Sequence, residues 1–359
     1  MLDWNPVAAP AASEAGPLAG VRVLDFSELV PGPFLTQSLV EMGADVIKIE
    51  RPPHGDNLRL LSPALFEALN RGKRSVRCNL KDDEQREQVL QLLDGADVLI
   101  ENYRPGAMQR LGLGPAEMLQ RNPRLIYVSV SGYGASGPWV QRAGHDMNYL
   151  AAAGIVALSM TQTNPSPVMG VPYADLGSSV YALAALNAAL FQRERSKQGQ
   201  HLDVSMADCA AHWCNVRTPV LRSMDVADTS EAIARIQCKP GYGVFLCSDQ
   251  QAITIAALEN HFWQALVRVL DLQEFADEAF HSHKHRLQHA DRINGKVRAK
   301  LASLSSAQAL ELFDAADIPA SLVESPLQLQ DNAQFKAREL FCSTPTGPLA
   351  RFPVRLTGM

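Results

Sequence analysis

Two residues that can handle protons, His145 and Asp175, lie 30 positions apart in the chain. An imidazole and a carboxylate on opposite sides of one carbon atom can remove a proton from one face and return it to the other. The pair therefore indicates general acid–base chemistry of the kind that a racemase needs. Each residue could instead have a purely structural role. His145 could be a structural histidine, and Asp175 could be an N-cap because it precedes a predicted helix.

Alternating strand and helix patterns predict the scaffold that holds this pair. Residues 21–26 and 45–50 are short apolar runs typical of buried strands, and residues 34–42 between them have helical spacing. Such a β-α-β unit favours a parallel, doubly wound sheet. The pattern continues with a helix, two strands and an Ala-rich helix over residues 82–93, 96–100, 124–130 and 176–195. A Gly-x-Gly-x-x-Gly motif does not follow the first strand, which argues against a nicotinamide or flavin site.

The pattern changes after about residue 229 and predicts a second, smaller α+β domain. Its expected strands and helices are residues 242–246, 252–255, 261–270, 286–304 and 307–316. A strand-like tail at 352–356 suggests that the chain returns to the first domain. The predicted parts are a flexible extension, a large domain, a linker, the small domain and a return segment, over residues 1–17, 18–205, 206–228, 229–325 and 326–359.

Composition excludes several classes of protein. A net charge of −5 gives no general attraction to nucleic acid or to an anionic membrane. No apolar run reaches the roughly 18 residues of a membrane span, and the first seventeen residues lack the pattern of a signal peptide. The six cysteines form no Cys-x-x-Cys pair and no zinc-site spacing, so reduced thiols in a cytoplasmic protein are expected.

Several short motifs occur in order along the chain. They are residues 43–52, 70–75, 101–106, 110–112, 131–138 and 257–263. Together they closely resemble the family III CoA-transferases, the CaiB/BaiF-like group that also contains α-methylacyl-CoA racemase. The resemblance runs from about Leu18 to Leu356.

The resemblance implies a fold and a set of ligand contacts. The fold is α/β, with a large doubly wound Rossmann-like CoA-binding domain, a smaller α+β domain and an intertwined homodimer. Coenzyme A enters as part of the thioester substrate, and no redox cofactor or metal is expected. The CoA contacts carry over onto Arg51, Lys73, Asn102, Tyr103 and Arg110. Arg and Lys suit phosphates, although each alone is more often a solvated surface charge.

The family contains two chemistries, and His145 decides between them. Racemases use the aspartate at 175 as an acid–base group and place a histidine where transferases commonly have tyrosine. This chain has His145 there, lacks the glycine run of many transferases near 238–243, and has Glu259 where a glutamate pairs with the racemase histidine. The preferred prediction is therefore a 2-methylacyl-CoA racemase that works by 1,1-proton transfer, with backbone N–H groups near Asp175 holding the enolate.

Two alternatives stay open. The first is CoA transfer between an acyl-CoA and a carboxylic acid, with Asp175 as the nucleophile. The second is a CoA-binding protein without catalytic activity. The acyl group of the substrate has no signature in the sequence.

Overall fold

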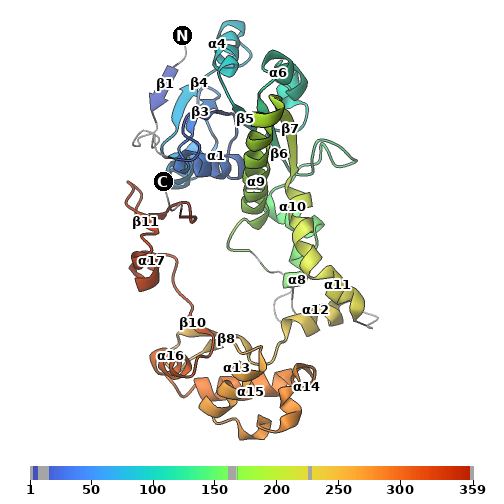
Figure 1. Cartoon of the computed structure of the whole chain (residues 1–359), viewed down its shortest axis with the longest axis vertical. Coiled ribbons are helices and arrows are strands. Elements are labelled where there is room, and N and C mark those ends of the chain that lie inside the picture. The colour runs from blue at the N-terminus through green and yellow to red at the C-terminus, as the bar shows by residue number, and fades with distance from the viewer. Residues whose placement is uncertain (1–2, 7–15, 161–166, 168, 225–228, 356–359) are drawn as a thin grey trace. The chain divides into compact units, whose positions relative to one another are not determined.

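The chain folds as two compact units (Figure 1). One unit comprises Met1–Thr218 and Glu339–Met359, and the other Pro219–Arg338. The structure is a computed structural model that describes residues 3–6, 16–160, 167, 169–224 and 229–355.

A seven-stranded sheet lies at the centre of the first unit, in the order β1-β4-β3-β2-β5-β6-β7. Strands β2 to β7 are parallel, and β1 pairs with β4 in the antiparallel sense. Their bounds are Asp3–Pro6, Arg22–Asp25, Asp45–Glu50, Arg74–Arg77, Val98–Glu101, Ile126–Ser131 and Gln200–Ser205. The four strands predicted for this domain correspond to β2, β3, β5 and β6 and are confirmed.

Helices cover both faces of this sheet. On one face, α1 (Pro31–Glu41) and α9 (Tyr173–Ser196) share a core with Val23 of β2. On the other face, α4 (Asp83–Asp94) shares a core with Leu24. Neighbouring residues of a strand enter different cores because side chains alternate between the two faces. The predicted doubly wound arrangement is confirmed.

The remaining helices of the first unit are short. They are α2 Leu58–Leu61, α3 Pro63–Asn70, α5 Ala107–Arg110, α6 Pro115–Arg121, α7 Asp146–Ala152, α8 Ile155–Ser159 and α10 Met206–Trp213 with the 3₁₀ turn Cys214–Val216, and α11 Thr218–Ser223 follows at the unit boundary.

Helix α9 is a core helix of the first unit. By length and composition alone it could cross a membrane, and it is the one such helix in the described part of the chain. Its residues Ala182, Leu186 and Leu190 are buried in the core against the sheet, however. Its apolar character is thus explained by packing within the unit.

The strand order defines a switch point between β2 and β5. Successive strands of the parallel sheet are added on one side from β2 to β4 and on the other side from β5 to β7. In open α/β sheets, ligands bind outside the carboxyl ends of the strands where this direction reverses. Strand β2 ends at Asp25 and β5 at Glu101, so the segments that follow these two residues form the expected ligand-binding edge.

The second unit is a small α+β body. Its three-stranded antiparallel sheet has the order β10-β9-β8. The bounds are β8 Tyr242–Leu246, β9 Ala252–Ala256 and β10 Ala320–Leu322, with helices α12 Thr229–Gln237, α13 Asn260–Val269, α14 His283–Gln288, α15 Ala290–Leu301, α16 Ser306–Ala315 and α17 Ala333–Ala337 and 3₁₀ turns Gln273–Phe275, Glu278–His281 and Leu329–Asp331. The core combines Phe245, Ile255, Trp263, Val297 and Phe313.

The structure differs from the sequence prediction at several boundaries. Helix α9 begins at Tyr173 rather than at 176, so Asp175 lies inside its first turn. The predicted helix over 286–304 is divided into α14 and α15. The predicted linker begins with α10, which packs on α9.

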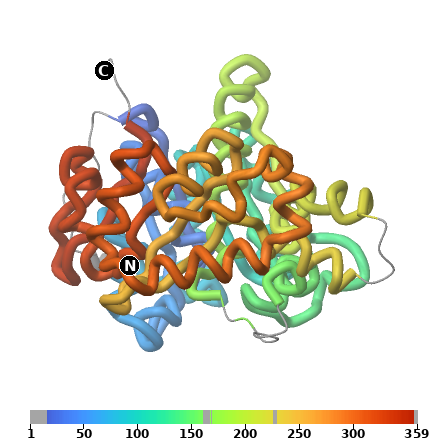
Figure 2. The backbone as a smooth tube through the Cα atoms, turned by 90° about the horizontal axis from the view of Figure 1, so that it is seen from below, coloured from blue at the N-terminus to red at the C-terminus, as the bar shows by residue number. Residues whose placement is uncertain are grey.

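The last part of the chain returns to the first unit (Figure 2). The short strands β11 (Phe341–Cys342) and β12 (Leu349–Ala350) pair with each other. The backbone N–H of Phe352 then donates to the carboxylate of Glu41 on α1. The described residues 352–355 form no strand, so the strand predicted there is wrong within that range, and residue 356 lies outside the described residues.

Candidate functional site

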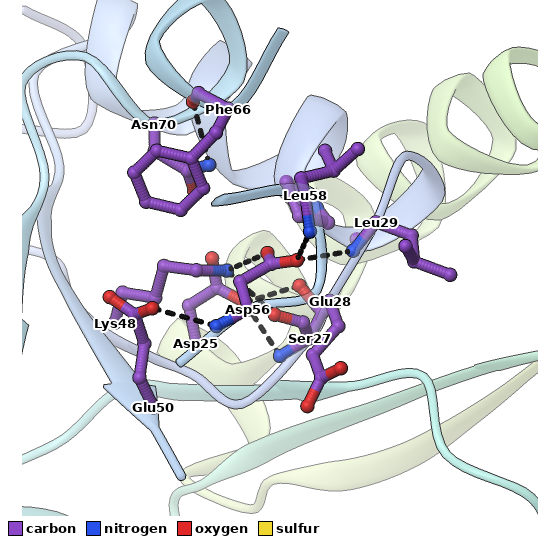
Figure 3. A network of polar contacts seen from close by, with 12 residues as sticks. Asp25, Ser27, Glu28, Leu29, Lys48, Glu50, Asp56, Leu58, Phe66 and Asn70 are labelled. Atoms are coloured by element: carbon purple, nitrogen blue, oxygen red, sulfur yellow. Dashed lines mark hydrogen bonds and ion pairs between the residues drawn. The ribbon is translucent and has the colours of Figure 1, made fainter. Parts of the chain in front are cut away.

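A buried ionic network lies at the carboxyl ends of β2 and β3 (Figure 3). The ammonium of Lys48 lies 3.0 Å from one carboxyl oxygen of Asp56 and donates to the carbonyl of Ser27 at 2.7 Å. The other oxygen of Asp56 accepts the backbone N–H groups of Leu29 at 3.1 Å and Leu58 at 2.9 Å. Both charged side chains are buried. The network therefore fixes the segment that follows β2 at the switch point.

Lys73, predicted to meet a CoA phosphate, lies inside the protein. Its ammonium is 3.2 Å from the carboxylate of Asp25 and donates to Asn70 Oδ1 at 2.8 Å and to the carbonyl of Pro33 at 3.1 Å. Burial alone would raise the pKa of Asp25. The charges of Lys48 and Lys73, together with hydrogen bonds from Ser27 and Thr36, outweigh burial and lower that pKa to about 2. A buried and fully paired ammonium is not positioned for a phosphate, so this geometry does not support the prediction for Lys73.

Two other predicted CoA contacts, Arg51 and Asn102, meet at Glu28. The Asn102 amide accepts the backbone N–H of Glu28 at 2.9 Å and donates to its carbonyl at 2.7 Å. The guanidinium of Arg51 lies 3.3 Å from the Glu28 carboxylate, and 59% of the Arg51 side chain is exposed. One amide hydrogen and one lone pair of Asn102 remain free by valence. A ligand approaching from solvent can therefore still bind both side chains.

Tyr103 and Arg110 belong to the segment after β5. Burial raises the pKa of the Tyr103 phenol, and the nearby Glu28 carboxylate raises it further, so the hydroxyl stays protonated. Arg110 is exposed at the end of α5. Its guanidinium lies over Gly106, where an added Cβ would be 3.2 Å from Nη1. Four of the five predicted contacts thus lie at or beside this edge of the sheet.

Asp175 occupies the first turn of α9, where its side chain is half-buried. The hydroxyl of Ser179, one turn later, lies 2.6 Å from the carbonyl of Pro31 at the start of α1. Gly177 packs against the ring of Trp213, and a Cβ there would lie 2.5 Å from that ring. Because α1 follows β2, the contact between Ser179 and Pro31 holds the first turn of α9, and Asp175 with it, near the carboxyl edge of the sheet.

The start of α9 is held by the carboxylate of Asp146. Asp146 Oδ1 accepts the backbone N–H of Ala174 at 2.7 Å and that of Asp175 at 3.2 Å. Burial raises the pKa of Asp175 to about 7, and the negative charge of Asp146 adds to this effect. Near neutral pH the Asp175 carboxyl therefore exists in both protonation states.

This arrangement also uses the donors that were predicted to hold an enolate. The N–H groups of Ala174 and Asp175 bind Asp146, and that of Leu176 bonds within the turn to the carbonyl of Pro172. Since these donors are occupied, the structure does not support a role for them in stabilising an enolate.

His145 is exposed and directly precedes α7. Its backbone N–H donates to Asn148 Oδ1 at 3.0 Å, and its carbonyl accepts the Asn148 N–H at 2.8 Å. Burial raises the pKa of Tyr149 on α7 to about 12, and the nearby carboxyl of Asp175 raises it as well. His145 and Asp175 thus lie at one junction, between the starts of α7 and α9.

Glu259, the predicted partner of His145, is exposed and precedes α13 in the second unit. Its carbonyl accepts the backbone N–H of Trp263 at 2.9 Å, which begins the helix. Because His145 belongs to the first unit, the pairing stays a prediction. In the described ranges, no group of three or more His, Cys, Asp or Glu side chains is arranged to hold a metal ion.

The motifs in the sequence do not single out Glu28 or Asp56, which organise the edge of the sheet. One signal was present: Lys48 is a charged residue within the apolar strand run 45–50. A buried lysine needs a buried acid, but the sequence does not show that Asp56 supplies it.

The sequence and fold of the chain are similar to those of known proteins. The profile of CoA-transferase family III matches residues 18–359. The chain is 32% identical to the acetyl-CoA:oxalate CoA-transferase of Acetobacter aceti, over 97% of this chain and 91% of that protein. It is 30% identical to the succinyl-CoA:glutarate CoA-transferase of Mus musculus, over 89% of this chain and 74% of that protein. The crystal structure of Rv3272 from Mycobacterium tuberculosis superposes with a TM-score of 0.83 and 30% identity, covering 96% of this chain and 94% of the other.

The chain belongs to CoA-transferase family III. The doubly wound α/β fold and the family predicted from the sequence are therefore confirmed, while the racemase branch and the intertwined homodimer stay predictions. The named relatives above are CoA-transferases, so they favour the transferase alternative over the racemase prediction.

Proposed function

We propose that this enzyme transfers CoA from an acyl-CoA to a carboxylic acid, with Asp175 as the nucleophile. The observation that carries the proposal is the half-buried Asp175 carboxyl, whose pKa burial raises to about 7, in the first turn of α9 near the carboxyl edge of the sheet. A carboxylate with a raised pKa is a stronger nucleophile than an ordinary one, and it is still ionised in part at neutral pH.

The proposed reaction needs no external oxidant or acid. The Asp175 carboxylate attacks the thioester carbonyl and expels CoA thiolate, which leaves a mixed anhydride on Asp175. The thiolate then attacks the Asp175 carbonyl, releases the first carboxylate and forms an aspartyl-CoA thioester. The acceptor carboxylate then attacks the aspartyl-CoA thioester and expels CoA thiolate, which leaves a second mixed anhydride. The thiolate attacks the acyl carbonyl of this anhydride, so that a new acyl-CoA leaves and the Asp175 carboxylate is regenerated.

The CoA contacts proposed for this chain are Arg51, Asn102, Tyr103 and Arg110. The exposed guanidinium groups of Arg51 and Arg110 suit the phosphates. Asn102 and Tyr103 stand at the switch point, where ligands of doubly wound folds bind. Lys73 is assigned a structural role instead, because its ammonium is buried against Asp25.

The acceptor is proposed to be a small carboxylic acid. Oxalate and glutarate are named for two relatives, and a panel of mono- and dicarboxylates would locate the preference of this chain. A homodimer in the cytoplasm is proposed from the family resemblance alone.

Racemisation of a 2-methylacyl-CoA is the second candidate. One observation favours it: His145 directly precedes Asp146, whose carboxylate binds the backbone of Asp175. The imidazole of His145 and the Asp175 carboxyl therefore belong to the same helix junction, and both are chemically able to accept and donate a proton.

One experiment separates the two candidates. The protein is incubated in D₂O with a branched acyl-CoA, with and without ¹⁴C-labelled acceptor acid. We expect ¹⁴C from the acceptor acid to enter the acyl-CoA pool. This transfer should be lost in Asp175→Asn but not in His145→Gln. Deuterium at C2 without acceptor, lost in both variants, would support racemisation instead. CoA binding without either reaction would leave only the binding-protein alternative.

A further inference from the structure

A row of polar side chains crosses three neighbouring strands at the carboxyl edge of the first unit's sheet. Glu101 on β5 is in register with Ser129 on β6, and Ser129 with Asp203 on β7. The hydroxyl of Ser129 lies 2.9 Å from His201 Nε2, and its presence beside Glu101 lowers the pKa of that carboxyl. Because side chains alternate along a strand, these residues share the face that Tyr127 occupies deeper in the core.

The backbone of two loops is hydrogen-bonded to the acidic side chains of this row. The carboxylate of Glu101 accepts the backbone N–H of Tyr103 at 2.8 Å. The carboxylate of Asp203 accepts the N–H of Ala135 at 3.0 Å. Glu101 is only 7% exposed, so its contact with Tyr103 is made from inside the protein. Asn102, between the two, is held on its other side by the backbone of Glu28.

We propose that Glu101 is a positioning residue, which holds the Asn102–Tyr103 segment in its CoA-binding conformation and makes the affinity for CoA depend on whether its carboxyl is ionised. This inference rests on the proposed function in one respect, that CoA binds at this segment. Glu101 itself is placed behind the segment and not against the ligand.

The surroundings of Glu101 put its ionisation in the physiological range. Burial raises its pKa to about 7, while the Ser129 hydroxyl and the Tyr103 N–H oppose this and Asp203 adds to it. The titratable groups that face it are Tyr103 on its own loop, Tyr127 on β6, and His201 and Asp203 on β7. On the other side, Leu24 of β2 and Phe26, which follows that strand, contribute apolar side chains to this face.

The direction of the effect follows from the hydrogen bond. A carboxylate accepts an N–H about twice as strongly as a neutral carboxyl does. As pH rises through about 7, Glu101 ionises and the Tyr103 N–H is held more firmly. The loop is then better ordered before CoA arrives, and a preorganised site binds more tightly. Affinity should therefore increase from pH 6 to pH 8.

The test uses dephospho-CoA as the ligand, because a phosphomonoester has its own pKa near 6. Its Kd is measured by calorimetry at pH 6, 7 and 8 for the wild type and for Glu101→Gln, which keeps the acceptor oxygen without the charge. The ratio of the variant's Kd to the wild type's cancels the titration of Asp175 and of the ligand. We expect a ratio near 1 at pH 6 that rises to about three- to tenfold at pH 8. Glu84→Gln, the same change at an exposed position of α4, should give a ratio near 1 throughout.

A second variant separates positioning from folding. Ser129→Ala removes a hydroxyl that lowers the pKa of Glu101, so the midpoint of the affinity profile should move to higher pH while its two plateaus remain. A ratio independent of pH for Glu101→Gln, or an unmoved midpoint for Ser129→Ala, would overturn the role of Glu101 and leave the proposed function intact. Failure of the wild type to bind dephospho-CoA or CoA at any pH would overturn both.

Discussion

Asp146 Oδ1 lies 3.2 Å from the backbone nitrogen of Asp175 and accepts its N–H. One acidic side chain thus fixes the backbone of another at the first turn of α9, and its charge helps burial keep the second carboxyl protonated up to about pH 7. The same contact closes the helix start to other anions. The chemistry of this junction therefore depends on the Asp175 side chain rather than on free backbone donors.

Asp146→Asn should move the pH profile of CoA transfer to lower pH. The transfer needs the carboxylate form of Asp175, so kcat/KM is expected to rise with pH to a plateau above about 7. Removing the charge of Asp146 removes one of the two causes that raise the pKa of Asp175. Burial remains, so the midpoint falls without reaching that of an exposed aspartate. A pH–rate profile of both proteins measures this.

Asp146→Ala is the matched variant, because it also removes the acceptor. Two N–H groups at the start of α9 then lose their partner, which should cost about 1–3 kcal/mol of stability. An unshifted profile in Asp146→Asn would contradict the electrostatic role given to Asp146.

Asp175→Asn should stabilise the protein at pH 8 but not at pH 4. Burial raises the pKa of Asp175 from its ordinary value of 3.8 to about 7, so the folded state binds the proton more tightly than the unfolded chain does. The stability that this proton contributes is present below about pH 4 and is lost as pH rises to about 7. Asparagine does not ionise, so at pH 8 we expect a gain of about 1–2 kcal/mol after allowance for screening at a half-buried group.

Thermal melts of Asp175→Asn and of the wild type at pH 4, 6 and 8 check this. The difference in Tm should grow with pH and level off above 7. A difference that is constant with pH would mean that Asp175 is not protonated in the folded state near neutrality.

Lys73→Met and Arg51→Ala should impair different properties, the first the stability of the fold and the second the binding of CoA. Lys73 is buried against Asp25, so its removal takes away one of the two ammonium groups that stabilise this buried carboxylate and should destabilise the fold by about 3–5 kcal/mol. Arg51 is mostly exposed, so Arg51→Ala should cost less than about 1 kcal/mol but weaken CoA binding roughly tenfold. Denaturant unfolding and calorimetry measure the two effects; a stable Lys73→Met with weakened CoA binding would restore Lys73 as a ligand contact.

Gly177→Ala should destabilise the junction of α9 and α10. An added Cβ would lie 2.5 Å from the ring of Trp213, so the two helices must separate, at a cost of about 1–3 kcal/mol. Because Asp175 lies half a turn earlier in α9, kcat should fall as well. Gly170→Ala, where an added Cβ meets nothing within 4 Å, is the control and should leave both unchanged.

Much of the fold could be predicted from the sequence because its signals are local. The run Asp45–Glu50 has the length and composition of a buried strand and coincides with β3. The sequence pattern predicts a start of α9 three residues too late, because nothing in the composition of residues 173–175 distinguishes a first helical turn from a loop. That error matters, because it turns Asp175 from a flanking residue into part of the helix.

The site was harder to predict because its partners are distant in the chain. Lys73 and Arg51 look equivalent in sequence, yet one pairs with Asp25 inside the protein and the other remains at the surface. The contact between Asn102 and Glu28 joins residues 74 positions apart. Motifs identify such residues, but only the packing of strands and helices decides which face a ligand.

The most direct test of the account is to trap the intermediate on Asp175. The enzyme is mixed with an acyl-CoA, quenched with hydroxylamine, digested and analysed by mass spectrometry. We predict a hydroxamate on the peptide that carries Asp175, present with the acyl-CoA, absent without it and absent in Asp175→Asn. An unmodified Asp175 peptide in a protein that exchanges the C2 proton of a branched acyl-CoA would contradict the transferase account.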